Sequence, residues 1–305
     1  MSDSLADDAL AVLLLCAFQG GEKKHYPLGL AEYNRVATIL YSRQKRPAFL
    51  LGDAPVHEIA SSAQVSPDRL QWLLDRRINL GFCLEEWQRK GFWISARSEK
   101  DYPERIRSRM RIGAPSLIFG TGNQTLLANG GLAIIGPDQI PSGRSKKACE
   151  AAIEAVKKGQ TVIVTGHLKM AKDVVKVAQE HSGCVIWVLH DGSLKLRLEK
   201  SNRQALSKGQ MVLITVQSPE APRKSGDRGF VGSLATALAD ELLYVDGSIN
   251  SKDQFRIASA AVGFAQSADH ALRSNECRLL VGRKVSQTIK QLRELGVGSQ
   301  LTISH

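Results

Sequence analysis

The segment from Gly131 to Gly166 constrains the fold of this 305-residue chain more than any other. A short apolar run at 132–135 leads into Gly136, a helical pattern follows, and a second apolar run at 161–164 ends at Gly166. This is the pattern of a βαβ unit, in which a helix joins two parallel strands. Ligands of such sheets bind at the carboxyl ends of the strands, so both glycines mark a place for a phosphate-bearing partner.

Apolar runs and helical patterns alternate on both sides of this unit. Other strands are predicted at 92–95, 114–120, 184–189, 211–216, 242–245 and 278–282, and helices at 143–158, 170–182, 195–208, 230–240 and 253–267. Short apolar strands between longer helices are typical of a parallel sheet that is covered on both faces. The predicted fold class is therefore α/β, with a Rossmann-like, doubly wound, mostly parallel sheet.

The residues before the first strand carry only helical patterns. Helices are predicted at 4–20, 30–43, 56–63, 66–81 and 84–90. In the fourth of them, Ser66 is placed to cap the helix, Pro67 to occupy its first turn and Gly81 to end it. The sequence thus predicts an N-terminal helical domain at 1–91 and a Rossmann-like domain at 92–305, with a helical C-terminal end at about 285–305.

Several classes of protein are disfavoured. The chain starts with acidic residues, whereas a signal peptide needs a basic start, and the apolar run at 9–18 is too short to cross a bilayer. The five cysteines are scattered and form neither a CxxC pair nor a cluster with histidine: Cys16, Cys83, Cys149, Cys184 and Cys277. We therefore expect a cytoplasmic protein with no membrane contact, no metal site and no cofactor.

Positive charge is concentrated in one part of the chain. The net charge is +11, and residues 139–208 alone contain 13 basic and 6 acidic residues, a local excess of +7. A clustered basic surface attracts polyanions, most commonly nucleic acid. The alternative is that these lysines only solvate exposed helix faces.

The basic cluster includes the predicted start of the first helix of the sheet domain. Ser142, Gly143, Arg144, Lys146 and Lys147 lie there, where the helix dipole also favours an anion. Capping by Ser142 and solvation of the cations would explain the same residues without a ligand.

Further candidate contacts lie downstream. Lys169, Lys172 and Lys176 recur on one face of the next predicted helix, and Arg228 ends a basic loop at 219–228. These side chains could hold the backbone of a nucleic acid. For base stacking, Phe230 is a better candidate than Trp187, which lies inside an apolar strand.

The turn after Gly136 is poorly suited to binding an anion. Pro137 lacks a backbone N–H donor and Asp138 adds a negative charge, so the turn at Gly136 is a weak phosphate cradle. Gly136 and Gly166 are equally explained by tight turns. The helix start at 142–147 is therefore the preferred anion contact.

No catalytic constellation is visible. His167 and His190 follow predicted strands, and Asp173 and Asp191 follow them closely, but no nucleophile with a partner base occurs nearby. The glycine patterns of hydrolases, P-loop proteins and kinases are also missing. We expect a protein without catalytic activity.

Several motifs, in order along residues 92–250, resemble the DNA-processing protein family DprA/Smf. The matching segments are Tyr102–Ile106, Ala114–Asn123, Leu132–Gly136, Pro141–Arg144, Val164–Gly166, Gly183–Gly192 and Ala237–Asp246. The sequence departs from the family where Gly136-Pro137-Asp138 replaces a Gly-Ser-Arg turn. It also departs at Val231-Gly232-Ser233, which stands in place of an Arg-Asn-Arg segment of the family. Arg228, three residues upstream, could substitute for the missing arginines.

The resemblance implies a Rossmann-like fold and binding of single-stranded DNA. It also implies loading of a RecA-type recombinase, dimerisation, and a role in recombination or natural transformation. Two other functions remain open. One is binding, sensing or cleavage of a nucleotide, although the glycine-rich loop of nucleoside-phosphate hydrolases does not occur. The other is a protein–protein scaffold with a degenerate pocket.

Overall fold

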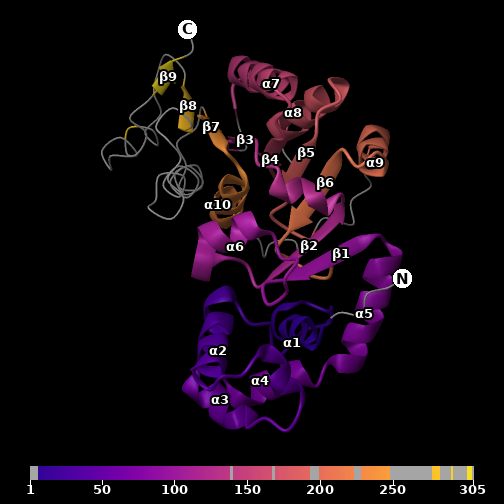
Figure 1. Cartoon of the computed structure of the whole chain (residues 1–305), viewed down its shortest axis with the longest axis vertical. Coiled ribbons are helices and arrows are strands. Elements are labelled where there is room, and N and C mark those ends of the chain that lie inside the picture. Colours follow the sequence, from indigo (N-terminus) through magenta and orange to yellow (C-terminus); the bar gives the residue numbers. More distant parts are fainter. Residues whose placement is uncertain are drawn as a thin grey trace.

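The computed structural model of the chain describes residues 6–137, 140–166, 169–192, 199–222, 228–247, 277–281, 290 and 301–303. Within this part of the chain, helices of residues 7–89 form a helical module at one end of the molecule. A sheet with helices on its faces forms the rest (Figure 1).

The helical module is built around its first helix. It consists of α1 (Asp7–Cys16), α2 (Leu30–Ser42), the 3₁₀ helix η1 (Pro47–Leu51), α3 (Val56–Ser62), α4 (Pro67–Leu74) and α5 (Arg77–Arg89). Helix α1 carries the apolar run seen in the sequence, and its Val12, Leu13 and Leu14 are fully buried. The other helices surround α1 because that helix is apolar on nearly all sides.

Helix α4 starts as predicted but ends earlier. The Ser66 hydroxyl accepts a hydrogen bond from the Arg69 N–H at 3.4 Å, and Pro67 is the first helical residue. The predicted end of this helix at Gly81 is wrong, because α4 ends at Leu74 and Gly81 lies inside α5. The buried residues of α5 recur at helical spacing, and their packing outweighs the low helix propensity of one glycine.

Replacing Gly81 with alanine is expected to raise the free energy of unfolding by about 0.5–1 kcal/mol. Gly81 is exposed, and a Cβ at this position would meet no atom within 4 Å. The measurement is chemical denaturation at low protein concentration. Gly21→Ala is the control: its site is equally open, but φ is +79°, so alanine should destabilise the protein there. Equal effects of both substitutions would contradict the assignment.

A buried arginine holds the segment between α4 and α5 against α1. The Arg76 guanidinium forms an ion pair with Glu22 at 2.9 Å, and these side chains are 8% and 5% exposed. It also donates hydrogen bonds to the carbonyl oxygens of Leu14, at 2.5 Å, and Ala17, at 3.2 Å. Arg76 thus satisfies carbonyls at the C-terminal end of α1, which have no partner within the helix.

An aromatic pair joins the helical module to the sheet. The Trp87 ring of α5 is fully buried and meets the Phe119 ring edge to face, with 5.5 Å between the ring centroids. Phe119 belongs to β2 (Leu117–Gly122), the second strand of the sheet. One continuous hydrophobic cluster therefore includes residues of α1–α5 and residues of the sheet.

Nine strands of the described residues form one sheet in the order β1-β2-β6-β5-β4-β3-β7-β8-β9. Besides β2, they are β1 (Phe92–Ala96), β3 (Leu132–Ile135), β4 (Val162–Thr165), β5 (Val185–Val188), β6 (Met211–Thr215), β7 (Glu241–Val245), β8 (Cys277–Val281) and β9 (Leu301–Ile303). The pairs β1–β2 and β2–β6 are antiparallel and the others are parallel. This confirms the predicted mostly parallel sheet.

Helices cover both faces of the sheet, which confirms the doubly wound architecture. One face packs against α7 (Ser142–Lys157), α8 (Lys169–Glu180) and α9 (Lys200–Ser207). The other packs against α10 (Arg228–Leu238), α6 (Glu104–Met110) and the 3₁₀ helix η3 (Gln124–Ala128). Side chains alternate along each strand, as in β3, where Leu132 and Ile134 face α7 and Ala133 and Ile135 face α10.

The predicted helical C-terminal end at about 285–305 is wrong at residues 301–303. These residues form β9, which pairs in parallel with β8 and places Leu301 opposite Leu279. Backbone groups of β8 find partners in this way, and the Leu-Thr-Ile sequence suits a strand. The helix predicted at 253–267 lies outside the described residues.

Strands β1 and β2 meet through an unusual cross-strand pair. Trp93 lies directly opposite Gly120, and its indole N–H donates a hydrogen bond to the Gly122 carbonyl at 3.1 Å. A Cβ at position 120 would lie 2.2 Å from the Trp93 ring. The indole ring thus covers the glycine and fills the space that a side chain would take.

In the part of the chain that the structure describes, no helix is long and apolar enough to cross a membrane.

Candidate nucleic-acid interface

Two of the predicted site residues, Gly136 and Arg144, lie where the strand order reverses. Strands β4, β5 and β6 succeed β3 on one side, whereas β7 pairs with β3 on the other. In doubly wound sheets, ligands bind in the crevice outside the carboxyl ends of the two strands at this switch point, here β3 and β7. Gly136 follows β3, and Asp246 and Gly247 follow β7.

Arg144 occupies this crevice. Its Nη1 donates hydrogen bonds to the carbonyl oxygens of Asp246, at 2.6 Å, and Gly247, at 3.0 Å. The same nitrogen lies 3.6 Å from the Asp246 carboxylate, which is fully buried, and the Arg144 side chain is only 15% exposed. The first turn of α7 is therefore tied to the end of β7, and Arg144 is directed at protein atoms.

Turn geometry accounts for both glycines of the predicted site. A Cβ on Gly136 would lie 2.8 Å from the Val245 carbonyl oxygen, so glycine permits β3 and β7 to pack closely there. Gly166 has φ of +76° and accepts a hydrogen bond from the Trp187 indole N–H. That bond and the burial of Trp187 fit the predicted core position of this ring. Asp138 and His167 lie outside the described residues.

A groove of about 720 Å³ runs between α7 and α8. We call it the α7–α8 groove; its lining residues include Ser142, Ser145 and Lys146 of α7, and Lys169, Asp173, Lys176 and Glu180 of α8. The structure thus brings together Ser142, Lys146 and Lys169, which the sequence placed in two separate helices. The groove opens on the surface of the α7–α8 layer, at the opposite end of the molecule from the helical module (Figure 1).

The other predicted residues lie outside the groove lining. Gly143 and Lys172 are exposed near it, and Lys147 is half-buried. Arg228 is the first residue of α10, which covers the opposite face of the sheet. It is therefore separated from the groove by the sheet.

Charges in the groove partly balance. Lys169 pairs with Asp173 at 2.7 Å, and this hydrogen bond raises the pKa of the lysine, which stays protonated at neutral pH. Lys176 lies 3.9 Å from Glu180, and Lys146 forms no ion pair with a described residue. Burial and the Asp173 carboxylate raise the pKa of the Cys149 thiol, so this cysteine beside the groove is a poor nucleophile.

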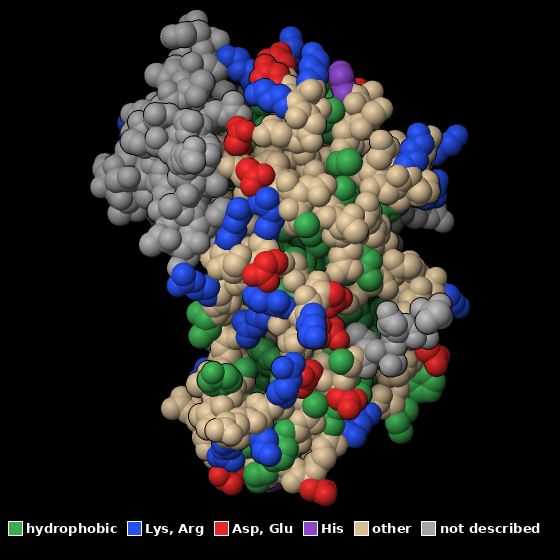
Figure 2. All heavy atoms as spheres, in the orientation of Figure 1, with side chains coloured by type: hydrophobic (Ala, Val, Ile, Leu, Met, Phe, Trp, Pro, Cys, Tyr) green, Lys and Arg blue, Asp and Glu red, His purple; other side chains and the backbone are tan. Residues whose placement is uncertain are grey.

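Basic side chains also gather over α6, but their contacts are structural. Figure 2 shows Lys and Arg mixed with acidic side chains at the α7–α8 end and a second basic gathering over α6. There, Arg105 pairs with Asp240 at 2.7 Å, and Arg109 donates hydrogen bonds to the carbonyls of Ala237 and Ala239. These arginines cap the C-terminal end of α10, as cations commonly do.

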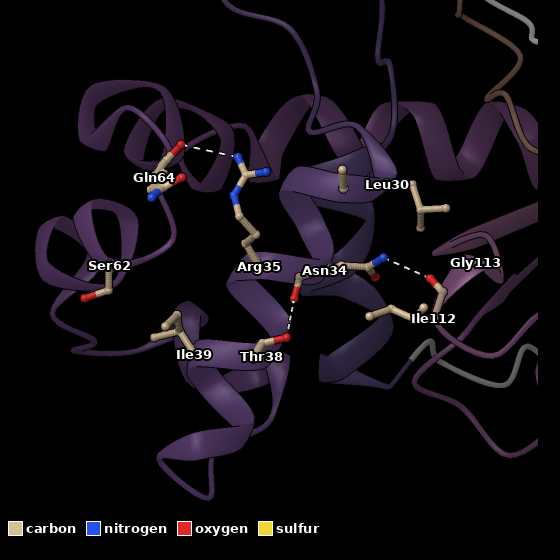
Figure 3. A pocket seen from close by; sticks show the side chains of 10 residues that line it. Leu30, Asn34, Arg35, Thr38, Ile39, Ser62, Gln64, Ile112 and Gly113 are labelled. Carbon is tan, nitrogen blue, oxygen red and sulfur yellow. Dashed lines mark hydrogen bonds between the residues drawn. The ribbon is translucent and has the colours of Figure 1, made fainter.

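A second cavity, of about 780 Å³, lies between the helical module and η2 (Arg111–Gly113), and we call it the junction pocket. The sequence did not indicate it. In this junction pocket, Arg35 points from α2 toward Gln64, and Ile112 approaches from the other side (Figure 3). The Asn34 side-chain amide donates a hydrogen bond to the Ile112 carbonyl oxygen at 2.9 Å. Residues so distant in sequence carry no local pattern that could have predicted the pocket.

Comparison with solved structures finds a protein of the same fold. Neither a protein-family model nor a curated protein sequence matches the chain. The structure of DNA processing protein A (DprA) from Streptococcus pneumoniae superposes with a TM-score of 0.68 and 14% sequence identity, covering 98% of this chain and 95% of that one. The chain has the DprA fold. The resemblance seen in the sequence is thus confirmed at the level of architecture.

A second DprA structure is also similar. It comes from Helicobacter pylori and concerns the binding mode of that protein for single-stranded DNA. It aligns with a TM-score of 0.47 and 16% identity, covering 70% of this chain and 92% of that one.

Proposed function

We propose that this protein binds single-stranded DNA in DNA processing or recombination, without catalysing a reaction. Two lines of support are the positive charge concentrated at residues 139–208 and the fold shared with a DNA processing protein over nearly the whole chain. A polyanion without a fixed shape needs an open, cationic surface rather than a closed pocket.

The α7–α8 groove is the observation that carries this proposal. Its three lysines, Lys146, Lys169 and Lys176, are exposed on neighbouring helices, so one strand can contact them in succession. Asp173 and Glu180 reduce the local charge, but exposed ion pairs of this kind stabilise a protein by only about 0–1 kcal/mol and can exchange for a phosphate. Contacts to phosphates alone would make binding salt-dependent and independent of base sequence.

A nucleotide is a weaker candidate as the ligand. A nucleotide would bind in the crevice between the ends of β3 and β7. The Arg144 guanidinium, which is bonded to Asp246 and Gly247, already fills that position. A heat-shift screen with nucleotides tests this alternative, and stabilisation by a nucleotide but not by an oligonucleotide would favour it over DNA.

Lys146→Gln combined with Lys169→Gln is expected to lower the affinity for a single-stranded oligonucleotide. The same double substitution should also make that affinity less dependent on salt concentration. Because each phosphate contact releases counterions, losing two should make the slope of log K against log salt concentration shallower by about 1.4. Fluorescence anisotropy at several salt concentrations measures both quantities.

The matched control is Lys158→Gln combined with Lys208→Gln. Both lysines are exposed and lie outside the groove, so this variant loses the same charge but should keep the slope. Equal losses in both variants would place the DNA elsewhere, and no salt-sensitive binding by the unchanged protein at micromolar concentration would refute the function.

The proposal extends to partners and setting. The DprA resemblance implies two protein partners, which are a RecA-type recombinase and a second copy of this chain. The proposed compartment is the cytoplasm, and the proposed process is natural transformation. Lys147 and Lys172 remain proposed contacts to DNA, whereas Arg144 is bonded to the end of β7 and Arg228 begins the helix on the other face of the sheet. Of these, Lys172 adjoins the α7–α8 groove most directly, because it belongs to α8 and is exposed.

A further inference from the structure

The junction pocket is a recess for which the proposed DNA binding gives no role. One face of α2 forms its floor through Thr38, the turn after α3 forms one wall through Gln64, and η2 forms the other through Ile112 (Figure 3). Its volume of about 780 Å³ lies within the range of ligand-binding sites. None of its lining residues belongs to the α7–α8 groove, so the pocket needs an explanation of its own.

Hydrogen bonds hold both walls of the pocket in place. The Arg35 Nε donates a hydrogen bond to the Ala63 carbonyl oxygen at 2.7 Å, which fixes the turn after α3. On the other side, Arg97 donates hydrogen bonds to the Asn34 side-chain oxygen at 2.6 Å and to the Ile112 carbonyl oxygen at 3.3 Å. Because the pocket is already formed, a ligand does not have to pay for ordering it.

Apolar side chains line the pocket, and one of them is mostly exposed. Leu30 and Ile39 lie on the α2 side, and Ile112, on the η2 side, is 72% exposed. A single exposed aliphatic residue is ordinary, but one that adjoins an apolar recess indicates a binding surface. Since Ile112 stays so exposed, its cover must lie across the surface, as a peptide does, rather than inside an enclosed cavity.

The charges at the pocket are positive. The described residues that line it include no acidic side chain. Arg35 is exposed and Arg97 is half-buried, and neither forms an ion pair with a described residue. The acidic residue of α2, Glu32, is instead paired with Arg69 at 2.7 Å.

These two properties together select the kind of partner. Arg35 bonds only to the carbonyl oxygens of Ala63 and Gln64, and a guanidinium has five N–H donors, so donors remain for a carboxylate. A peptide can supply that carboxylate next to an aliphatic side chain. A nucleic acid offers phosphates, but it has no aliphatic side chains to cover Ile112.

We propose that the junction pocket binds a peptide segment of another protein that carries large aliphatic side chains next to Asp or Glu. An aliphatic side chain of the segment packs against Ile39 and Ile112, and a carboxylate pairs with Arg35. This goes beyond DNA binding, because the α7–α8 groove lies at the opposite end of the molecule from the helical module (Figure 1).

Selection from a library of random dodecapeptides displayed on phage, with the full chain as target, tests the inference. The enriched peptides should combine large aliphatic residues with acidic ones, and a labelled synthetic copy should bind the protein in fluorescence anisotropy. A library without any enriched peptide, or one enriched in basic or purely polar sequences, would overturn the inference.

A substitution in the pocket shows whether the enriched peptide binds there. Ile112→Ser should weaken its binding about tenfold, because the apolar surface that the peptide covers is lost. The matched control is Ile78→Ser, since Ile78 is 80% exposed but lies on α5, outside the pocket, and this variant should bind the peptide normally. Equal affinities of the two variants would contradict the proposed site.

The charge is tested on the peptide, because Arg35 also holds a wall of the pocket. Replacing the acidic residues of the enriched peptide with their amides should weaken binding about tenfold, the loss expected for a hydrogen bond to a charged group. Unchanged affinity would show that the arginines do not recognise a carboxylate.

Two further measurements identify other occupants. A single-stranded oligonucleotide should leave the peptide bound, and Lys146→Gln combined with Lys169→Gln should bind the peptide as the unchanged protein does. Displacement of the peptide by the oligonucleotide would assign the pocket to DNA. Weaker self-association of Ile112→Ser in sedimentation equilibrium, with peptide binding unchanged, would assign it to a second copy of the chain, and either result would overturn the inference.

Discussion

Replacing Arg76 with methionine is expected to lower the free energy of unfolding by about 3–5 kcal/mol. The substitution leaves the buried Glu22 carboxylate without its cationic partner and removes hydrogen bonds to the carbonyls of Leu14 and Ala17. Burial already lowers the pKa of the arginine, yet Glu22 keeps it charged. Urea denaturation followed by circular dichroism measures the loss.

Two further variants test this explanation. Arg43→Met removes an exposed ion pair with Glu58, so it should cost less than about 1 kcal/mol. Adding Glu22→Met to Arg76→Met should recover part of the loss, because the unpaired buried charge is then gone. If Arg76→Met cost no more than Arg43→Met, the pair would not hold α1 in place.

Replacing Trp87 with alanine is expected to cost about 3–5 kcal/mol of stability. Trp87 is fully buried, and its contact with Phe119 joins α5 to β2. Its removal leaves a cavity between the helical module and the sheet, so both should lose stability together. Thermal unfolding should show one transition at a lower temperature.

The control for this substitution lies on the other face of the same helix. Phe82→Ala removes a ring that is mostly exposed in the single chain, so it should change the stability of the monomer by less than about 0.5 kcal/mol. A separate early transition of the helical module in Trp87→Ala would show that the hydrophobic cluster does not unfold as one unit.

Much of the fold could be predicted because its signals are local. The strand at 132–135 appears as expected because four consecutive apolar residues end at a glycine turn, and a strand buried on both faces requires such a run. The end of α4 at Leu74 carries no local signal in the sequence, and the ion pair that holds the segment after it joins Arg76 to Glu22, which is distant in sequence. The prediction that Gly81 ends a helix was wrong, because the tertiary packing of α5 outweighs the low helix propensity of this glycine.

The site was predictable in part. Ser142, Lys146 and Lys169 follow from helix starts after strands, and parallel order brings such starts to one edge of the sheet. The role of Arg144 was not predictable, because its partners, Asp246 and Gly247, lie about a hundred residues later. An arginine at a helix start is equally suited to a phosphate and to the end of a neighbouring strand.

The contact between Trp93 and Gly120 should couple the substitutions that these two positions tolerate. Any side chain at 120 collides with the indole ring, and a smaller residue at 93 uncovers the glycine backbone. Neither change is tolerated well alone, whereas an exchange of large and small residues across the strands keeps the volume. Related sequences should therefore either keep both residues or exchange the bulk between β1 and β2.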